Sequence, residues 1–175
     1  MWSGDFMARI DELSVVIDAG PLIHLDELEC LDLLSDYSSL VTTDIVWDEA
    51  QRHRTRLQPR HIPGLQIAPV SGHPSTRLSV LSDTLDLAAG EISALVLAEQ
   101  HNLKQFLTDD AAARVTGESL GLQVHGTIGI VVRAIRYNRR TRDEVLEMLK
   151  SIPKRSTLHL SKSLLSEVIR RVEVK

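Results

Sequence analysis

The stretch Ser14-Val15-Val16-Ile17-Asp18 decides the fold. Three consecutive β-branched residues precede a carboxylate, and such an unbroken apolar run is typical of a strand buried on both faces of a parallel sheet. Further short strands are expected over 40–43, 65–70, 105–107 and 122–125, with helical patterns between them. This alternation predicts an α/β fold, a three-layer α/β/α sandwich with a mainly parallel central sheet.

Apolar spacing and capping residues set the expected helices. Leucines and isoleucine at helical spacing predict one helix over 22–35. Asp44 is expected to cap the next helix, and Gly90 to begin a buried one that runs to residue 101. The acids on the outer side of the first helix are expected to form a solvated face: Asp26, Glu27, Glu29 and Asp32. Later helices are expected over 111–120, from 127, from the capping box of Thr141 and Glu144, and after Ser161 as a cap.

The composition of the chain predicts a single globular domain. Its 175 residues are 43% hydrophobic and 25% charged, which excludes the disordered and collagen-like classes. We expect one domain over 1–175, with 141–175 as a C-terminal helical extension packed on it. Cys30 is the only cysteine, so an internal disulfide and a cysteine-based zinc site are excluded. With no apparent signal peptide or membrane span, we expect a cytoplasmic protein.

The charges are unevenly distributed along the sequence. Residues 1–50 contain twelve acids and one base, whereas residues 111–175 contain thirteen bases and six acids. Two groups of arginines stand out: Arg52, Arg54, Arg56 and Arg60, and Arg133, Arg136, Arg139, Arg140 and Arg142. These arginines are candidates for holding a phosphate backbone, for binding an acidic partner, or for keeping the protein soluble.

Several acids are expected to meet at one edge of the sheet. Asp18 ends the first strand, Asp109 and Asp110 end the fourth, and Glu91 lies in the first turn of a buried helix. Taken singly, each is explained as a helix cap or a first-turn anion. Gathered without matching Lys or Arg, they would repel one another unless protons or a cation neutralised them. Carboxylate oxygens favour Mg²⁺ or Mn²⁺, ions that commonly serve phosphate chemistry.

Four motifs in register resemble those of a known family. They are Asp18-Ala19-Gly20-Pro21-Leu22-Ile23, Val46-Trp47-Asp48-Glu49, Gly90-Glu91-Ile92-Ser93-Ala94-Leu95 and Leu107-Thr108-Asp109-Asp110. In order and spacing they resemble the acidic motifs of PIN-domain ribonucleases, a family that includes VapC-like toxins. The resemblance extends over about residues 14–140, and the tail resembles the DUF3368 branch of PIN proteins.

The resemblance implies a metal-dependent endoribonuclease that hydrolyses RNA phosphodiester bonds with Mg²⁺ or Mn²⁺. Carried over residue by residue, it implies the catalytic set Asp18, Glu49, Glu91 and Asp110. The implied metal ligands are Asp18, Glu91 and the pair Asp109 and Asp110, with Asp110 as the direct ligand. The residues expected to contact substrate are Thr108, Thr127, Arg52 and Arg54. A homodimer and the role of toxin in a toxin-antitoxin pair, with an antitoxin protein as partner, are further implications.

Two other interpretations remain open at this level. A phosphoacceptor domain would use Asp18 as its phosphorylated residue. One class of such domains needs a second Asp at the position where this chain has Gly20. The other class needs a Lys after the last strand, which the residues directly after that strand do not supply. Gly20 also departs from the Ser or Thr that many PIN proteins have there. The remaining alternative is a catalytically silent module of the same fold that acts through a protein partner.

Overall fold

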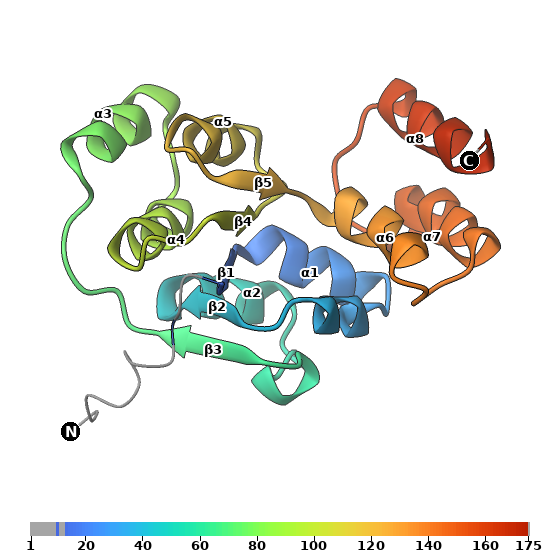
Figure 1. Cartoon of the computed structure of the whole chain (residues 1–175), viewed down its shortest axis with the longest axis horizontal. Coiled ribbons are helices and arrows are strands. Elements are labelled where there is room, and N and C mark those ends of the chain that lie inside the picture. The colour runs from blue at the N-terminus through green and yellow to red at the C-terminus, as the bar shows by residue number, and fades with distance from the viewer. Residues whose placement is uncertain (1–9, 11–12, 175) are drawn as a thin grey trace.

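The computed structural model describes residues 10 and 13–174, and in this part of the chain five short strands form one parallel sheet. The strands are β1 (Val15–Ile17), β2 (Leu40–Thr43), β3 (Leu65–Ala68), β4 (Gln105–Leu107) and β5 (Gln123–His125). Their order is β3-β2-β1-β4-β5, and every neighbouring pair is parallel (Figure 1). The α/β fold with a parallel central sheet is confirmed.

Helices cover both faces of this sheet. In chain order they are α1 (Ala19–Glu27), the 3-10 helix η2 (Leu31–Asp36), α2 (Asp44–His53), the 3-10 helix η3 (Pro59–His61), α3 (Thr76–Leu85), α4 (Ala89–Gln100), α5 (Ala111–Ser119), α6 (Thr127–Arg136), α7 (Arg142–Arg155) and α8 (Lys162–Val174). α4 and α5 contact the sheet on one face with α3 beside them, and α1 and α6 contact each other on the opposite face (Figure 1). α2 contacts α1 of one helical layer and α4 of the other, so it connects the two layers.

The central strand is buried as its sequence predicts. Val16, Ile17 and Phe106 have no exposed surface, so β1 and β4 lie inside the core. Ile17 pairs with Leu107 in the parallel register, and Asp18 and Thr108 therefore follow at adjacent strand ends. The expected meeting of these two strand ends is confirmed. No helix in the described part of the chain combines the length and hydrophobicity that crossing a lipid bilayer requires.

Two local predictions were wrong. The helix expected over 22–35 ends at Glu27, because the chain turns at Glu29 with a φ of 56° before the 3-10 helix begins at Leu31. This turn lets Cys30 and the following leucines reach the core, although the apolar spacing continues unbroken across it. Asp44 does not cap α2; the Thr43 hydroxyl accepts the Val46 N–H at 3.1 Å instead. The capping box at Thr141 and the cap at Ser161 are confirmed.

The acids from Asp26 to Asp36 lie partly on the expected solvated face, where Glu29 and Asp32 are exposed, and they also bind other segments of the domain. The ion pairs are Asp26 with Arg54, Glu29 with Arg155, Asp32 with Arg140 and Asp36 with Arg139. Glu27 accepts hydrogen bonds from the hydroxyl groups of Ser156 and Thr157 and from the Thr157 N–H. Most of these partners lie after α6, so the acids of the N-terminal half hold the C-terminal helices.

Candidate functional site

Four carboxylates from four different elements act on one another near the carboxyl ends of β1 and β4. Asp18 follows β1, Asp110 is the N-cap of α5, Glu49 lies on α2, and Glu91 lies in the first turn of α4. The charges of Glu49 and Asp110 raise the pKa values of both Asp18 and Glu91. The structure therefore brings together the four acids that the sequence motifs singled out.

Asp18 is the most buried member of this set, with 5% of its surface exposed. Burial, with smaller contributions from the nearby charges of Glu49 and Asp110, raises its pKa to about 6. Hydrogen bonds from the Ala19 N–H and from Thr108 Oγ1, which lies 2.9 Å from Asp18 Oδ2, act in the opposite direction. A buried carboxylate with a pKa near 6 is ready to exchange its proton for a cation at neutral pH.

Thr108 links Asp18 to the next strand end. Its hydroxyl group donates to Asp18 and accepts the Asp110 N–H at 3.2 Å, and the side chain is fully buried. Asp110 Oδ1 in turn accepts the Ala113 N–H at 2.8 Å and caps α5. These bonds fix the directions of two acids relative to each other, and they use only one oxygen of Asp110.

Glu91 is held in a similar way by its own helix. Its Oε2 accepts the Ala88 N–H at 2.7 Å, as the first turn of α4 requires. Burial is the largest cause that raises the pKa of Glu91 to about 7, and the charges of Asp110, Asp18 and Glu49 contribute to the rise. Both burial and the neighbouring carboxylates therefore disfavour the ionised form of Glu91.

Glu49 reaches this group across a glycine. A Cβ atom at position 90 would lie 2.8 Å from Glu49 Oε2, so a larger residue there would force the carboxylate to shift. A buried hydrogen bond of 2.7 Å between the hydroxyl groups of Thr43 and Ser93 joins the start of α2 to α4, and Ser93 also donates to the Gly90 carbonyl. Sequence reasoning missed both hydroxyl groups, although Thr43 directly before a helical pattern is a recognisable capping signal.

Asp109 points away from this set although it adjoins Asp110. One of its oxygens, Oδ2, accepts from His24 Nδ1 at 2.7 Å and from the Thr127 hydroxyl at 2.6 Å. The other oxygen accepts the Thr127 N–H at 2.7 Å. These contacts join the strand end to α1 and α6 and favour a positioning role. Metal binding by Asp109 stays a prediction, and no feature of the sequence pointed to His24.

The residues expected to contact substrate have different surroundings. Thr108 and Thr127 are fully buried and donate to Asp18 and Asp109, which favours positioning over substrate contact. Arg54 pairs with Asp26 at 2.5 Å, whereas Arg52 is exposed on the same helix end. Of these four, Arg52 is the side chain that remains available to a phosphate backbone.

The four carboxylates suit a hard divalent cation by their chemistry. Within the described residues, no group of three or more His, Cys, Asp or Glu side chains is already arranged to hold a metal ion. None of the four acids forms an ion pair with a described Lys or Arg. Glu91 and Asp110 each have a second oxygen that accepts no hydrogen bond from this part of the chain. The donor set therefore fits Mg²⁺ or Mn²⁺, with side-chain rotation needed to close around the ion.

A parallel α/β sheet with unneutralised carboxylates at the ends of its central strands has the architecture of a domain that binds ligand at this sheet edge. Residues 14–174 match a family model, DUF3368, that is described as a PIN domain. The chain belongs to the PIN-domain family, whose members are generally nucleases, and the resemblance seen in its four motifs is confirmed. No curated protein matches the chain.

Proposed function

We propose that this PIN domain is an endoribonuclease that hydrolyses RNA phosphodiester bonds with Mg²⁺ or Mn²⁺ held by Asp18, Glu49, Glu91 and Asp110. One observation carries the proposal: four carboxylates are close enough for their charges to act on one another, and no described Lys or Arg pairs with any of them. A fold would gain more from pairing such charges, as it does on α1. Leaving them unpaired suits a site that takes up a cation.

In such a site the four acids would hold the ion, and neighbouring groups would orient the acids. A bound Mg²⁺ or Mn²⁺ would lower the pKa of an attacking water and offset the charge that develops on the phosphate. Thr108 holds Asp18 in its buried position, and the Ala88 N–H holds Glu91, so both acids are oriented beforehand. Ion binding would displace the protons that Asp18 and Glu91 carry near neutral pH.

The substrate class and the cellular role rest on the family resemblance. RNA as substrate follows from the likeness of the four motifs to those of PIN-domain ribonucleases. We also propose a cytoplasmic, homodimeric toxin that an antitoxin protein controls. A short reading frame beside the gene that encodes an antitoxin would support this role, and a monomer by light scattering at tens of micromolar protein would argue against the dimer.

The nuclease proposal is tested with a matched pair of variants on one helix. End-labelled single-stranded RNA and DNA are incubated with the purified protein in Mn²⁺, in Mg²⁺ and in EDTA. We expect RNA cleavage that EDTA abolishes and that Glu49→Gln reduces by about a hundredfold, since one ligand of the ion is lost. Asp48→Asn, the exposed neighbour, should stay within about twofold of wild type.

Other outcomes would contradict the proposal. Cleavage that persists in EDTA would exclude a divalent ion, and equal activities of Glu49→Gln and Asp48→Asn would remove Glu49 from the site. Absence of cleavage with either ion and either nucleic acid, in protein shown to be folded, would favour the catalytically silent interaction module.

A further inference from the structure

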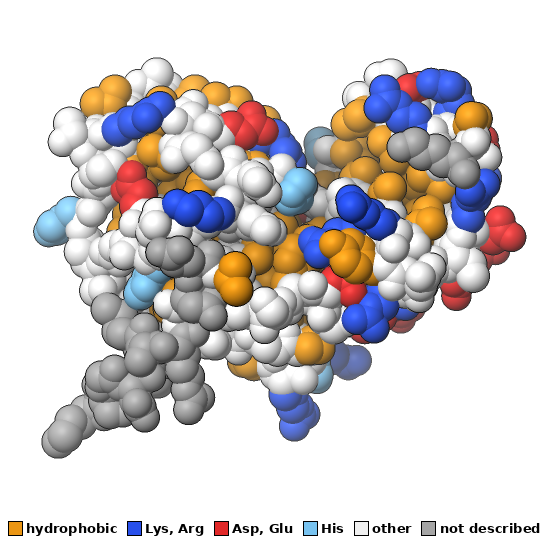
Figure 2. Space-filling model, viewed as in Figure 1, with side chains coloured by type: hydrophobic (Ala, Val, Ile, Leu, Met, Phe, Trp, Pro, Cys, Tyr) orange, Lys and Arg blue, Asp and Glu red, His pale blue; other side chains and the backbone are white. Residues whose placement is uncertain are grey.

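A cavity of about 860 Å³ lies between β5, α6 and α8, and none of the four carboxylates lines it. Figure 2 shows the corresponding hollow between the two lobes of the molecule, with hydrophobic side chains exposed inside it. Its aliphatic lining comes from two helices that face each other across the space: Ile128, Val132 and Ile135 of α6, and Val168 and Val172 of α8. An aliphatic surface of this kind favours an occupant with apolar side chains.

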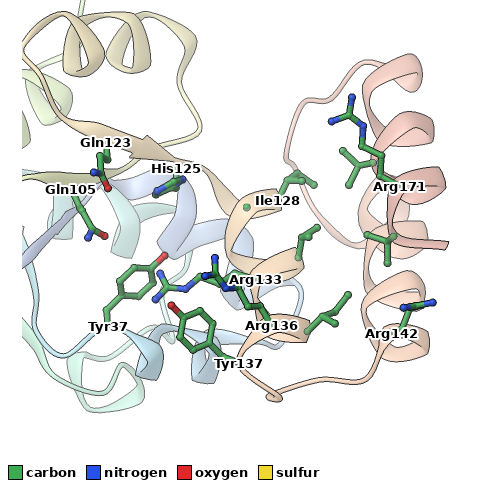
Figure 3. A pocket seen from close by; sticks show the side chains of 15 residues that line it. Tyr37, Gln105, Gln123, His125, Ile128, Arg133, Arg136, Tyr137, Arg142 and Arg171 are labelled. Atoms are coloured by element: carbon green, nitrogen blue, oxygen red, sulfur yellow. The ribbon is translucent and has the colours of Figure 1, made fainter. Parts of the chain in front are cut away.

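The same cavity is rich in positive charge. Its charged lining residues are Arg133, Arg136, Arg142 and Arg171, and no described Asp or Glu lines it (Figure 3). His125 also lines it, but burial and the nearby arginine charges lower its pKa and favour the neutral ring. Neighbouring arginines are neutralised: Arg139 pairs with Asp36 and Arg140 with Asp32. Within the described residues, Arg133, Arg136 and Arg142 form no ion pair, whereas Arg171 pairs with Glu167 of its own helix. At this cavity, Arg133, Arg136 and Arg142 are therefore available to an outside anion.

Arg133 is fixed in place between two aromatic rings. Its guanidinium carbon lies 4.4 Å from the ring centroids of both Tyr37 and Tyr137 (Figure 3). Its Nε–H group is buried and donates no hydrogen bond to the described residues, so the charge is held in position with hydrogen-bonding capacity to spare. A charge immobilised in this way loses little entropy when an anionic group binds to it.

We propose that this groove binds an acidic amphipathic segment of a partner protein. Apolar side chains of the segment would contact the valines and isoleucines of α6 and α8, and its carboxylates would pair with Arg133, Arg136 and Arg142. A small inorganic anion would leave the aliphatic walls uncovered. RNA is less well matched, because the walls between the charges are aliphatic and each tyrosine already has one face turned to Arg133.

The proposal is tested on the full chain by fluorescence anisotropy. The probe is a labelled helical peptide of about 15 residues, with Leu at i, i+3, i+4 and i+7 on one face and Glu on the other. Three comparison probes are used. The first is a peptide of the same composition with a scrambled sequence, the second has Lys in place of Glu, and the third is a single-stranded RNA of similar length. We expect the amphipathic acidic peptide to bind most tightly and its affinity to fall with salt.

Charge variants locate the binding surface. Arg136→Gln together with Arg142→Gln should weaken peptide binding by about tenfold, because two charge pairs are lost. The matched control, Arg56→Gln with Arg60→Gln, removes the same charge from the exposed loop and should change affinity less than about twofold. Val168→Ser removes apolar contact without adding charge and should weaken binding independently of salt.

Several results would overturn the proposal. These are no binding of the acidic peptide by folded wild-type protein, equal binding of the scrambled peptide, tighter binding of the RNA probe, or equal losses in the groove and loop variants. The nuclease assay is separate, since none of these substitutions touches the four carboxylates.

Discussion

Two groups of acids in this protein have opposite surroundings. On α1 and η2, acids pair with arginines: Asp26, Glu29, Asp32 and Asp36 each have one within 2.9 Å. At the strand ends, Asp18, Glu49, Glu91 and Asp110 have one another and no described Lys or Arg. The two groups can be called the paired acids and the strand-end acids.

The difference shows what each group contributes. The paired acids join segments far apart in the sequence, and their charges are already neutralised. Most of these pairs are solvent-exposed, where a single pair stabilises by about 1 kcal/mol or less. The strand-end acids instead destabilise the metal-free fold when ionised, because burial and mutual repulsion oppose their charge. Such a cost is common at sites that serve binding or catalysis.

The neighbours Asp110 and Asp109 provide the largest expected contrast. Asp110→Asn should reduce Mn²⁺-dependent RNA cleavage by about a hundredfold while the thermal unfolding temperature changes little, because an amide still caps α5. Rates and melting curves measured on the same preparations separate the two effects. Full activity of Asp110→Asn would place Asp110 outside the metal site and would break the proposed strand-end group.

The pH dependence of stability tests the buried position of Asp18. The pKa of Asp18 is raised to about 6 in the folded protein, so the unfolded chain releases this proton first as the pH rises. Metal-free protein should therefore lose stability between about pH 4 and pH 7, by about 3 kcal/mol through Asp18, of which about half falls above pH 5. Urea unfolding in EDTA measures this slope. It should flatten in Asp18→Asn, and an unchanged slope there would contradict the assignment.

Asp109→Asn should act on the fold instead. An amide has one acceptor oxygen where the carboxylate has two, so its NH₂ group would face one of the donors from His24 and Thr127, and we expect a loss of about 2 kcal/mol in the free energy of unfolding. Chemical denaturation measures the loss, and calorimetry should show Mn²⁺ affinity within a few-fold of wild type. If Mn²⁺ binding disappeared while stability stayed constant, Asp109 would belong with the strand-end acids.

The smallest effect is expected from Glu27, which accepts hydrogen bonds and does not pair with an arginine. Burial alone would raise the pKa of Glu27, but hydrogen bonds from Thr157 and Ser156 outweigh it and lower the pKa below its ordinary value. Glu27→Gln should cost about 1 kcal/mol at neutral pH, and this difference should vanish as the pH falls through the lowered pKa, because the wild-type carboxyl then becomes protonated too. Cleavage activity should not change. Urea titrations of wild type and Glu27→Gln, at neutral pH and at acidic pH, test this.

Part of the strand-end group is predictable because the relevant signals are local. A β-branched run that ends in Asp18 identifies a buried strand, and parallel strands share one carboxyl edge, so the pair Asp109 and Asp110 follows from the same rule. The choice of Asp110 and the inclusion of Glu49 come from the family resemblance. Glu91 is marked by its place in the first turn of an apolar helix. These inferences need no knowledge of distant contacts.

The remaining features depend on contacts between distant residues, which local patterns do not contain. Asp32 and Arg140 are 108 residues apart, and a helical acid alone indicates only an exposed face. Asp109 and Asp110 are alike in sequence, and the proximity of His24 and Thr127 separates their roles. The turn at Glu29 is hidden because leucines keep a helical spacing across it.

Calorimetric titration of the protein with Mn²⁺ at about pH 6.5, repeated in two buffers of different ionisation enthalpy, tests the proposed metal site most directly. We predict saturable binding with release of protons, because Glu91, with a pKa of about 7, is mostly protonated near this pH and Asp18, with a pKa of about 6, is partly protonated, and both must be ionised to hold the ion. Glu49→Gln should weaken the binding, and Asp48→Asn should not. Absence of binding, or binding that is the same in wild type and in Glu49→Gln with no protons released, would contradict a metal site built from the strand-end acids.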